Sequence, residues 1–278
     1  MSMTTGISRR AAIRGIGVAL AGSRTLPASV YGNKKVTALV VGGDRYHNMD
    51  YIRTALGKTL GRDLGLTMDF SDEVTVLATR FLKDYRMLIM LRDGMMFPSG
   101  YSDGGGRGRS VSDPPLPPIE EKATYWMTPE QGKAVKDFVR GGRAALFYHN
   151  CTYISPHNPD FRDVIGGVTL EHPPMRPFKV KIVNHDHPIT RGVRDFVVTD
   201  EQHFETFEKD PKYVLMQSVN EDGLTWRDHG TSSVAGWAYD YGKGRVCYLA
   251  PGHTIAAPWN PEYEKVQKNA AKWLLREI

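Results

Sequence analysis

The run Lys35-Val36-Thr37-Ala38-Leu39-Val40-Val41-Gly42-Gly43 decides the fold of this 278-residue chain. Its centre is continuously apolar, which is typical of a strand that is buried on both faces of a parallel sheet. Apolar residues at helical spacing then predict a helix over residues 50–60, and a second short strand follows over residues 66–70. The opening of the chain therefore predicts a right-handed βαβ unit.

The alternation of strand and helix continues to residue 150. A helix is predicted over residues 76–82 and further buried strands over 85–91 and 144–148. Thr128-Pro129-Glu130-Gln131 combines an N-cap hydroxyl, a proline at the first helical position and a capping-box Gln, so a helix is expected from there to Arg140. This alternation predicts an α/β domain in which helices flank a parallel sheet.

The second half of the chain has a different pattern, with many strands and few helices. Gly242 and Gly244 predict a hairpin turn, because glycine supplies the positive φ that such turns require. A closing helix is predicted over residues 261–275. Strands are predicted over residues 178–184, 214–219, 234–239 and 245–249. We interpret this half as a strand-rich extension of the sheet.

Composition limits the function classes. Hydrophobic residues make up 41% and charged residues 24% of the chain, close to the average of globular proteins, and no apolar run approaches the length of a membrane span. The formal net charge is +5, but the Lys and Arg residues are scattered among acidic residues and form no basic block, which argues against a nucleic-acid partner. Residues 92–127 are rich in glycine, serine and proline and are predicted to form a long loop without regular structure, which is a lid, a binding loop or a disordered insertion.

The first 30 residues resemble a twin-arginine export signal. Arg9 and Arg10 precede a short, weakly hydrophobic run over residues 15–21. We expect export to the periplasm by this route, and the alternative is a basic tail on a cytoplasmic protein. The domain itself is expected over residues 35–278.

Polar side chains follow several of the predicted strands. Asp44, Tyr46 and His47 follow the first strand, Arg92 the third, His149 and Asn150 the fourth, and His253 the last. Asp200, Glu201 and His203 add a cluster from the second half. Because ligands of parallel sheets bind beyond the carboxyl ends of the strands, we expect these groups to meet at one edge.

These residue types suit acid–base chemistry. A carboxylate beside an imidazole fixes its tautomer and raises its pKa, so His149 and His253 are the proton-transfer candidates, with Asp200 and Glu201 to orient them. A divalent metal such as Zn²⁺ is the competing use of the same groups, although the one HxH spacing, 185–187, lies in a predicted turn. No cofactor is assigned.

Cysteine chemistry is not expected. Cys151 lies two residues beyond His149, but bulky neighbours replace the glycines that a nucleophile elbow needs. Cys151 and Cys247 are interpreted as buried structural residues.

Aromatic residues near the same edge could stack on the CH faces of a sugar, and core packing is the alternative for each. We expect a group of substrate-binding residues around the catalytic candidates His149, His253, Asp200 and Glu201. Its members are Asp44, Tyr46, His47, Arg92, Asn150, His203, Trp237 and Trp259.

The chain resembles the ThuA-like trehalose-utilisation family over about residues 35–278. The motifs that carry the resemblance are the loop with His47, Tyr148-His149, His187-Pro188-Ile189-Thr190, Asp200-Glu201, Gly236-Trp237 through Val246, Pro251-Gly252-His253 and Asn269-Ala270-x-x-Trp273. The resemblance implies a flavodoxin-type fold like that of class I glutamine amidotransferases, without their catalytic cysteine.

It also implies a role in carbohydrate metabolism, through hydrolysis or elimination at a glycoside or a 3-keto-glycoside. Residues His47, His149, Asp200, Glu201 and His253 match the polar motifs of the family. One departure is Thr254-Ile255-Ala256-Ala257, where relatives often carry an acidic and an aromatic residue. The alternative is a non-catalytic domain that binds a sugar or a partner on the same scaffold. The sugar, the linkage and the oligomeric state stay open.

Overall fold

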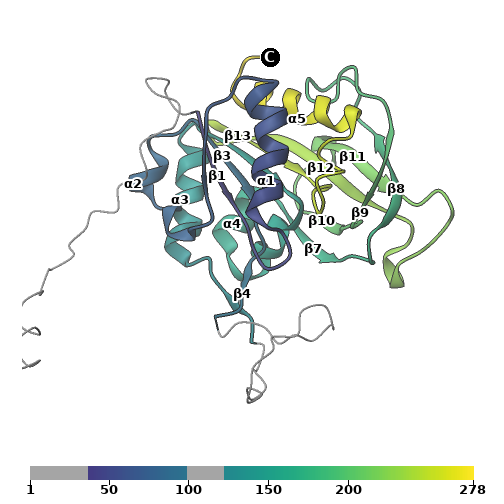
Figure 1. The fold of residues 1–278 in the computed structure, drawn as a ribbon, viewed down its shortest axis with the longest axis horizontal. Helices are drawn as coiled ribbons and strands as arrows, with labels where there is room; N and C mark the ends of the chain where they lie inside the picture. Colours follow the sequence, from purple (N-terminus) through teal and green to yellow (C-terminus); the bar gives the residue numbers. More distant parts are fainter. Residues whose placement is uncertain (1–36, 99–121) are drawn as a thin grey trace, which may run out of the picture.

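A single mixed sheet of nine strands forms the centre of the computed structural model, which describes residues 37–98 and 122–278 (Figure 1). Five neighbouring strands are parallel and follow the order β2 (Met68–Ser71), β1 (Ala38–Gly42), β3 (Met87–Leu91), β6 (Ala144–Tyr148) and β13 (Gly244–Leu249). Four antiparallel strands continue the sheet as β12 (Ser232–Tyr241), β11 (Val214–Val219), β8 (Arg176–Ile182) and β9 (Phe196–Asp200). The predicted fold class, a parallel sheet with a strand-rich extension, is confirmed.

Helices cover both faces of the parallel strands (Figure 1). One face carries α1 (Met49–Leu56), which continues as a π-helical segment (Gly57–Arg62), and α5 (Pro261–Leu274). The other face carries α3 (Pro129–Arg140) and α4 (Pro159–Ile165), which pack against each other. All five residues of β1 and of β3 are buried, as the apolar runs predict. Burying each Val, Leu, Ile or Met side chain of these two strands contributes about 1.5–3 kcal/mol, which fixes the strands in the centre of the sheet.

Helix α3 begins with the predicted capping box. Thr128 Oγ1 accepts a hydrogen bond from the backbone N–H of Gln131 at 3.3 Å, and Gln131 Oε1 accepts one from the N–H of Thr128 at 2.8 Å. The hairpin between β12 and β13 is also present, with Gly242 at a φ of 59°. Local chemistry therefore determined both features.

Two local predictions were wrong. Residues 76–82 form a 3₁₀ turn (Val74–Val76) and the four-residue α2 (Thr79–Leu82) rather than one helix. The loop 92–127 contains regular structure, because β4 (Met95–Met96) pairs with β5 (Thr124–Tyr125). Residues 99–121, the central part of that loop, lie outside the described residues, as does the predicted export signal at residues 1–30.

Several elements were missed because their sequences carry weak periodicity. They are α4, β9 and a two-stranded sheet of β7 (Gly167–Glu171) and β10 (Phe204–Phe207). Short 3₁₀ segments also occur over His149–His157, Pro211–Tyr213 and Arg227–His229. Among residues 37–98 and 122–278, no helix has both the length and the apolar character that crossing a bilayer requires.

The antiparallel part of the sheet curls back toward the parallel part. Although β9 is the outermost strand, its last residue, Asp200, accepts hydrogen bonds from the backbone N–H groups of Gly252 and His253 at 2.9 and 3.0 Å. Those two residues follow β13, in the middle of the sheet. The curl therefore brings the end of β9 to the carboxyl ends of the parallel strands.

Candidate active site

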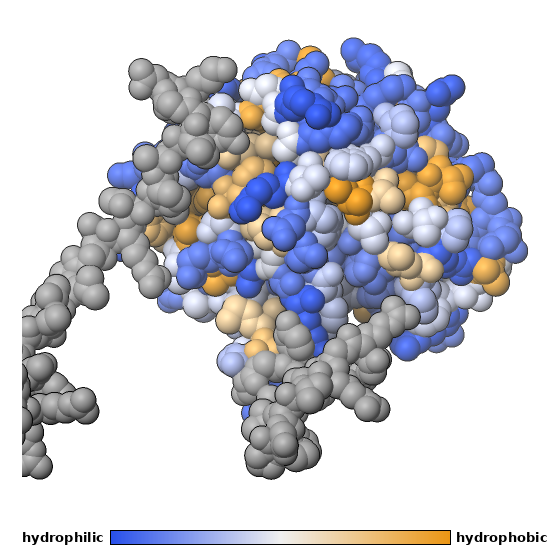
Figure 2. Space-filling model, in the orientation of Figure 1, coloured by the Kyte–Doolittle hydropathy of each residue, from blue (hydrophilic) through white to orange (hydrophobic). Residues whose placement is uncertain are grey.

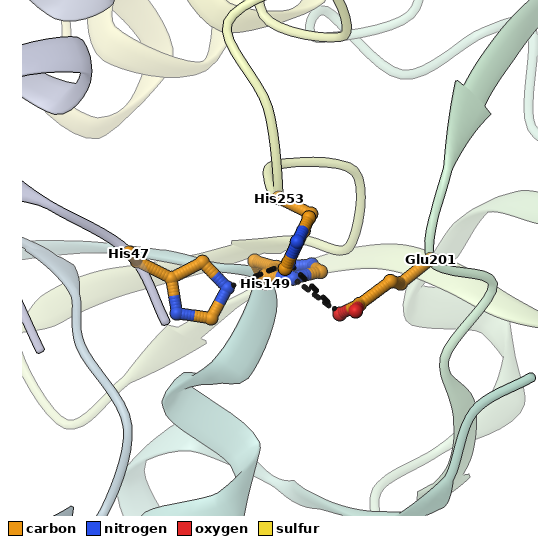
Figure 3. Close-up of side chains that lie close together, drawn as sticks. All are labelled: His47, His149, Glu201 and His253. Carbon is orange, nitrogen blue, oxygen red and sulfur yellow. Dashed lines mark hydrogen bonds and ion pairs between the residues drawn. The ribbon is translucent and has the colours of Figure 1, made fainter. Parts of the chain in front are cut away.

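Three histidines from separate strand ends meet at the carboxyl edge of the sheet (Figure 3). His47 follows β1, His149 follows β6 and His253 follows β13. Nε2 of His47 lies 3.0 Å from Nδ1 of His253, and the ring centroids of His47 and His149 are 5.0 Å apart. The structure thus brings together the three imidazoles that the sequence placed at one edge.

Glu201 joins these histidines from the end of β9. Its Oε2 atom lies 3.0 Å from His253 Nδ1, 3.4 Å from His149 Nε2 and 3.6 Å from His203 Nε2. Burial alone would raise the pKa of this carboxyl, but the interactions with His149, His203 and His253 hold it well below its usual value. Glu201 is therefore an anion on which several imidazoles converge.

Asp44 orients His47. Its Oδ1 atom lies 2.9 Å from His47 Nδ1, and Oδ2 accepts hydrogen bonds from Asn150 Nδ2 and from the backbone N–H of Asp93, both at 2.9 Å. Burial raises the pKa of Asp44, but the hydrogen bond from His47 and those from backbone N–H groups lower it to about 2. Because an ionised carboxylate only accepts, Nδ1 of His47 carries the proton and Nε2 keeps its lone pair.

His149 is fully buried and has a backbone φ of 46°, a conformation that non-glycine residues rarely adopt. Its Nδ1 atom lies 2.9 Å from the carbonyl oxygen of Ala250 and so donates a proton to it. Burial, and then the neighbouring His203, lower the pKa of His149 well below its ordinary value. The neutral ring therefore presents an unprotonated Nε2 to Glu201.

Asp200 holds the backbone rather than an imidazole. Besides the N–H groups of Gly252 and His253, it accepts the N–H of Glu201 at 2.7 Å. Burial raises the pKa of Asp200 to about 6 despite these hydrogen bonds. The carboxylate fixes the loop that carries His253 and thus positions that residue.

The pair His203 and Glu205 extends the cluster inward. His203 stacks on His149 with ring centroids 4.1 Å apart, and its Nδ1 atom lies 3.6 Å from Glu205 Oε1. Burial lowers the pKa of His203, but Glu201 and Glu205 raise it to about 9. Glu205 also accepts a hydrogen bond from the Tyr248 hydroxyl at 2.7 Å.

Sequence reasoning missed Glu205 and also His172, which stacks on His203 with ring centroids 5.1 Å apart. His172 follows β7, and Glu205 lies in β10. The pairing of these two short strands would have placed both residues beside His203, but neither strand was recognised.

The remaining predicted binding residues divide between the rim and the scaffold. Tyr46 is 50% exposed and lies beside His47, with its ring 6.4 Å away in an edge-on orientation. Arg92 is buried and donates hydrogen bonds to the carbonyl oxygens of Gly43 and Asp72, so it fixes the loops. A cavity of about 280 Å³ opens beside this site, lined by Asp44, Arg45, Arg92, Met95, Met96, Phe97 and Pro98.

The two predicted tryptophans lie elsewhere. Trp237 is fully buried, donates from Nε1 to the carbonyl oxygen of Ile165 at 2.7 Å and stacks on Tyr248. Its ring belongs to the core and has no face free for a sugar. Trp259 is 37% exposed and lies 5.9 Å from the ammonium group of Lys58, which belongs to the π-helical segment after α1.

The cysteines have the structural character that the sequence indicates. Cys151 and Cys247 are free and fully buried. Cys151 Sγ lies 3.2 Å from the carbonyl oxygen of Met90, and burial raises the pKa of its thiol to about 12. Residue 151 therefore lacks the thiolate that a cysteine nucleophile needs.

The family model described as ThuA, trehalose utilisation, matches residues 37–274. A ThuA-like protein from Bacteroides uniformis superposes with a TM-score of 0.61 at 18% identity, covering 90% of this chain and 95% of the other. A ThuA-like protein from Parabacteroides merdae gives a TM-score of 0.63 at 13% identity, covering 88% and 91%.

A longer enzyme contains the same fold. The β-galactosidase from Rahnella sp. R3 superposes with a TM-score of 0.52 at 14% identity, covering 87% of this chain and 32% of the enzyme. A search of curated proteins finds no match to the sequence.

Proposed function

Because the chain belongs to the ThuA family, whose model is described as trehalose utilisation, we propose that it is a carbohydrate-active enzyme acting on a glycoside or a 3-keto-glycoside. The observation that carries the proposal is the contact between Glu201 Oε2 and His253 Nδ1 at 3.0 Å, at the mouth of a buried imidazole cluster. A carboxylate–imidazole pair in this position can take up and return one proton near neutral pH.

Exposure separates the roles within the site. The side chains of His253 and Glu201 are 23% and 15% exposed, whereas that of His149 is fully buried. His253 and Glu201 can therefore contact a substrate. His149 acts on the reaction through Glu201, so of the two proton-transfer candidates it becomes the positioning residue.

The proposed reaction is an elimination followed by hydration, or direct hydrolysis. A keto group at C3 acidifies the neighbouring C–H bond, and the pair takes up that proton. The electron pair of the C–H bond forms a C=C bond as the glycosidic C–O bond breaks, and the departing oxygen receives a proton. Addition of water across the C=C bond then completes a net hydrolysis.

The surface beside the pair could bind the sugar. The exposed ring of Tyr46 offers a stacking face, and the cavity of about 280 Å³ beside Asp44 and Arg92 is close to the size of small-ligand pockets. A small carbohydrate is therefore the substrate class that we propose.

Turnover assays on a panel of glycosides and their 3-keto derivatives test this function. We expect product with the wild-type chain and a loss of at least about 100-fold in kcat for His253→Gln and Glu201→Gln. His185→Gln is the matched control, since His185 is exposed on a loop beside β8. Unchanged turnover in both site variants would remove the pair from the mechanism.

The alternative is a domain that binds sugars without chemistry. The similarity to the β-galactosidase supports this alternative, because the same fold makes up about a third of that longer enzyme. Calorimetric binding of a sugar with no product after long incubation would support the alternative and contradict the enzymatic proposal.

A further inference from the structure

We propose that the carboxyl edge of the sheet binds one divalent transition-metal ion, such as Zn²⁺, through Nε2 of His47, Nε2 of His149, Nδ1 of His253 and a carboxylate oxygen of Glu201. The ligand atoms of these four residues all lie within 4.8 Å of one another (Figure 3). The inference concerns the same residues as the proposed function, but it does not depend on which sugar is bound or on whether one is turned over.

The second hydrogen bonds of two imidazoles fix which nitrogen faces the proposed ion. His47 donates from Nδ1 to Asp44, and His149 donates from Nδ1 to the carbonyl oxygen of Ala250. Both rings therefore direct an Nε2 lone pair toward Glu201 and His253. Metal-binding histidines are oriented in this way, by a carboxylate or a backbone carbonyl on the opposite nitrogen.

Nε2 of His149 supplies an independent observation. This atom is buried, belongs to a fully buried side chain and has no hydrogen-bond partner. An orphaned lone pair in the interior costs free energy, and buried polar atoms without a partner are rare. A cation at the centre of the cluster would satisfy the lone pair.

The distances between donor atoms fit a tetrahedral site. Zn–N and Zn–O bonds of about 2.0–2.2 Å at tetrahedral angles place neighbouring ligand atoms roughly 3.3–3.6 Å apart. The observed separations are 3.0 Å for His47 Nε2 to His253 Nδ1, 3.0 Å for His253 Nδ1 to Glu201 Oε2 and 3.4 Å for His149 Nε2 to Glu201 Oε2. These three pairs would need shifts of only a few tenths of an ångström to accommodate an ion, and the other three pairs lie within 4.8 Å of each other.

The donor set also fits the chemistry of the ion. Three imidazoles and one carboxylate suit Zn²⁺ and the other late divalent metals of the first transition row. The rival arrangement has no metal, and a proton on His253 Nδ1 is then shared between Glu201 Oε2 and His47 Nε2, each 3.0 Å away. The rival still leaves His149 Nε2 without a partner.

A second group, His172, Glu201 and His203, is a weaker candidate. Nδ1 of His172 lies 2.9 Å from the carbonyl oxygen of Pro173 and donates to it, while His203 lies between Glu201 and Glu205. Both nitrogens of His203 also lack a hydrogen-bond partner, but Nδ1 of His172, the atom 3.8 Å from Glu201, is protonated and offers an ion no lone pair, and this group has three members rather than four. We therefore assign one ion per chain.

Titration calorimetry tests the site on the untagged full chain after removal of metal with EDTA. We expect about one Zn²⁺ per chain, and Co²⁺ should give the intense visible absorption of a tetrahedral complex. Substitutions His47→Gln and Glu201→Gln should each weaken Zn²⁺ binding at least 100-fold, with far-UV circular dichroism unchanged. His185→Gln and His157→Gln should bind as the wild type does, because both residues lie outside the cluster.

Wild-type binding no tighter than that of the doubly substituted His47→Gln, Glu201→Gln chain would overturn the proposal, as would unchanged affinity in both single variants. If Glu201→Gln does not fold, Asp44→Asn replaces it, since this variant alters a residue that orients a ligand. No substrate is present in these titrations. A chain that binds the metal but turns over no sugar leaves this inference standing and contradicts the proposed function, and a chain that turns over sugar but binds no Zn²⁺ does the reverse.

Discussion

His47 Nε2 and His253 Nδ1 lie 3.0 Å apart although 206 positions separate the two residues in the chain. The two loops that carry them leave β1 and β13, which are parallel strands of one sheet with β3 and β6 between them. The contact is therefore a product of the sheet order.

Asp44→Asn should weaken Zn²⁺ binding and sugar turnover by about 10–100-fold, because it removes the charge that orients His47. The amide can still accept one of the backbone hydrogen bonds that Asp44 receives, so the loop should stay folded. Calorimetry and initial-rate assays measure both effects. Asp69→Asn is the matched control, since Asp69 accepts a hydrogen bond from Tyr85 in another part of the sheet. Equal losses in both variants would argue against a specific role for Asp44.

Gly252→Ala should displace His149 and reduce activity at least about 10-fold. A Cβ at position 252 would lie 2.9 Å from Cβ of His149, closer than two such atoms can approach. Gly57→Ala is the control, because nothing lies within 4 Å of a Cβ there and the backbone is helical. That control should raise the free energy of unfolding by about 0.5–1 kcal/mol. Full activity of Gly252→Ala would show that His149 can move without consequence.

Cys151→Ala should keep full turnover and lose about 1 kcal/mol of stability from the small cavity that it creates. The reason is that the thiol is fully buried, and burial raises its pKa to about 12. Incubation of the native chain with iodoacetamide should likewise leave activity intact. Rapid inactivation by this reagent that the alanine variant escapes would instead identify a cysteine nucleophile.

Glu262→Gln should destabilise the chain at neutral pH and have little effect below pH 2. Hydrogen bonds with Lys265 and with the backbone and guanidinium of Arg194 lower the pKa of Glu262 from 4.5 to about 2. Because the folded pKa is lowered, the stabilisation is complete above pH 4.5 and disappears as the pH falls toward 2. The urea midpoints of the wild type and of Glu262→Gln should therefore differ at neutral pH and converge as the pH falls toward 2. Glu277→Gln is the control, because Glu277 is exposed, and the urea midpoint of this variant should change with pH as that of the wild type does.

Arg9→Lys with Arg10→Lys should retain the chain in the cytoplasm if residues 1–30 are a twin-arginine signal. Cell fractionation and immunoblotting measure the distribution. Arg14→Lys is the control because it keeps the paired arginines. Export of the doubly substituted chain at the wild-type level would reject the predicted route.

The accuracy of the sequence-based prediction varied with the range of the interactions involved. The strand over 144–148 and the capping box at Thr128 appear where the sequence placed them, because apolar runs and capping side chains act locally. Trp237 shows the opposite case. Its position after a glycine in a predicted strand is compatible with an edge or with the core, and only the packing against Tyr248 and the Ile165 carbonyl places it in the core.

The sequence by itself determined that His47 and His149 follow strands that end at one edge of a parallel sheet, since the direction of these strands is fixed by the βαβ connections. Folding brought His253 to the same edge, because β13 follows β12 through a hairpin and only its pairing with β6 makes it parallel to the other strands. The tertiary structure decided that Glu201 completes the group, because β9 reaches that edge only when the antiparallel strands curl back. It also decided which nitrogen each imidazole presents, because the partners of the opposite nitrogens come from loops that are brought together by folding. The alternation of strands and helices is a local property of the chain, whereas the curl of the sheet and the tautomers depend on contacts between distant segments.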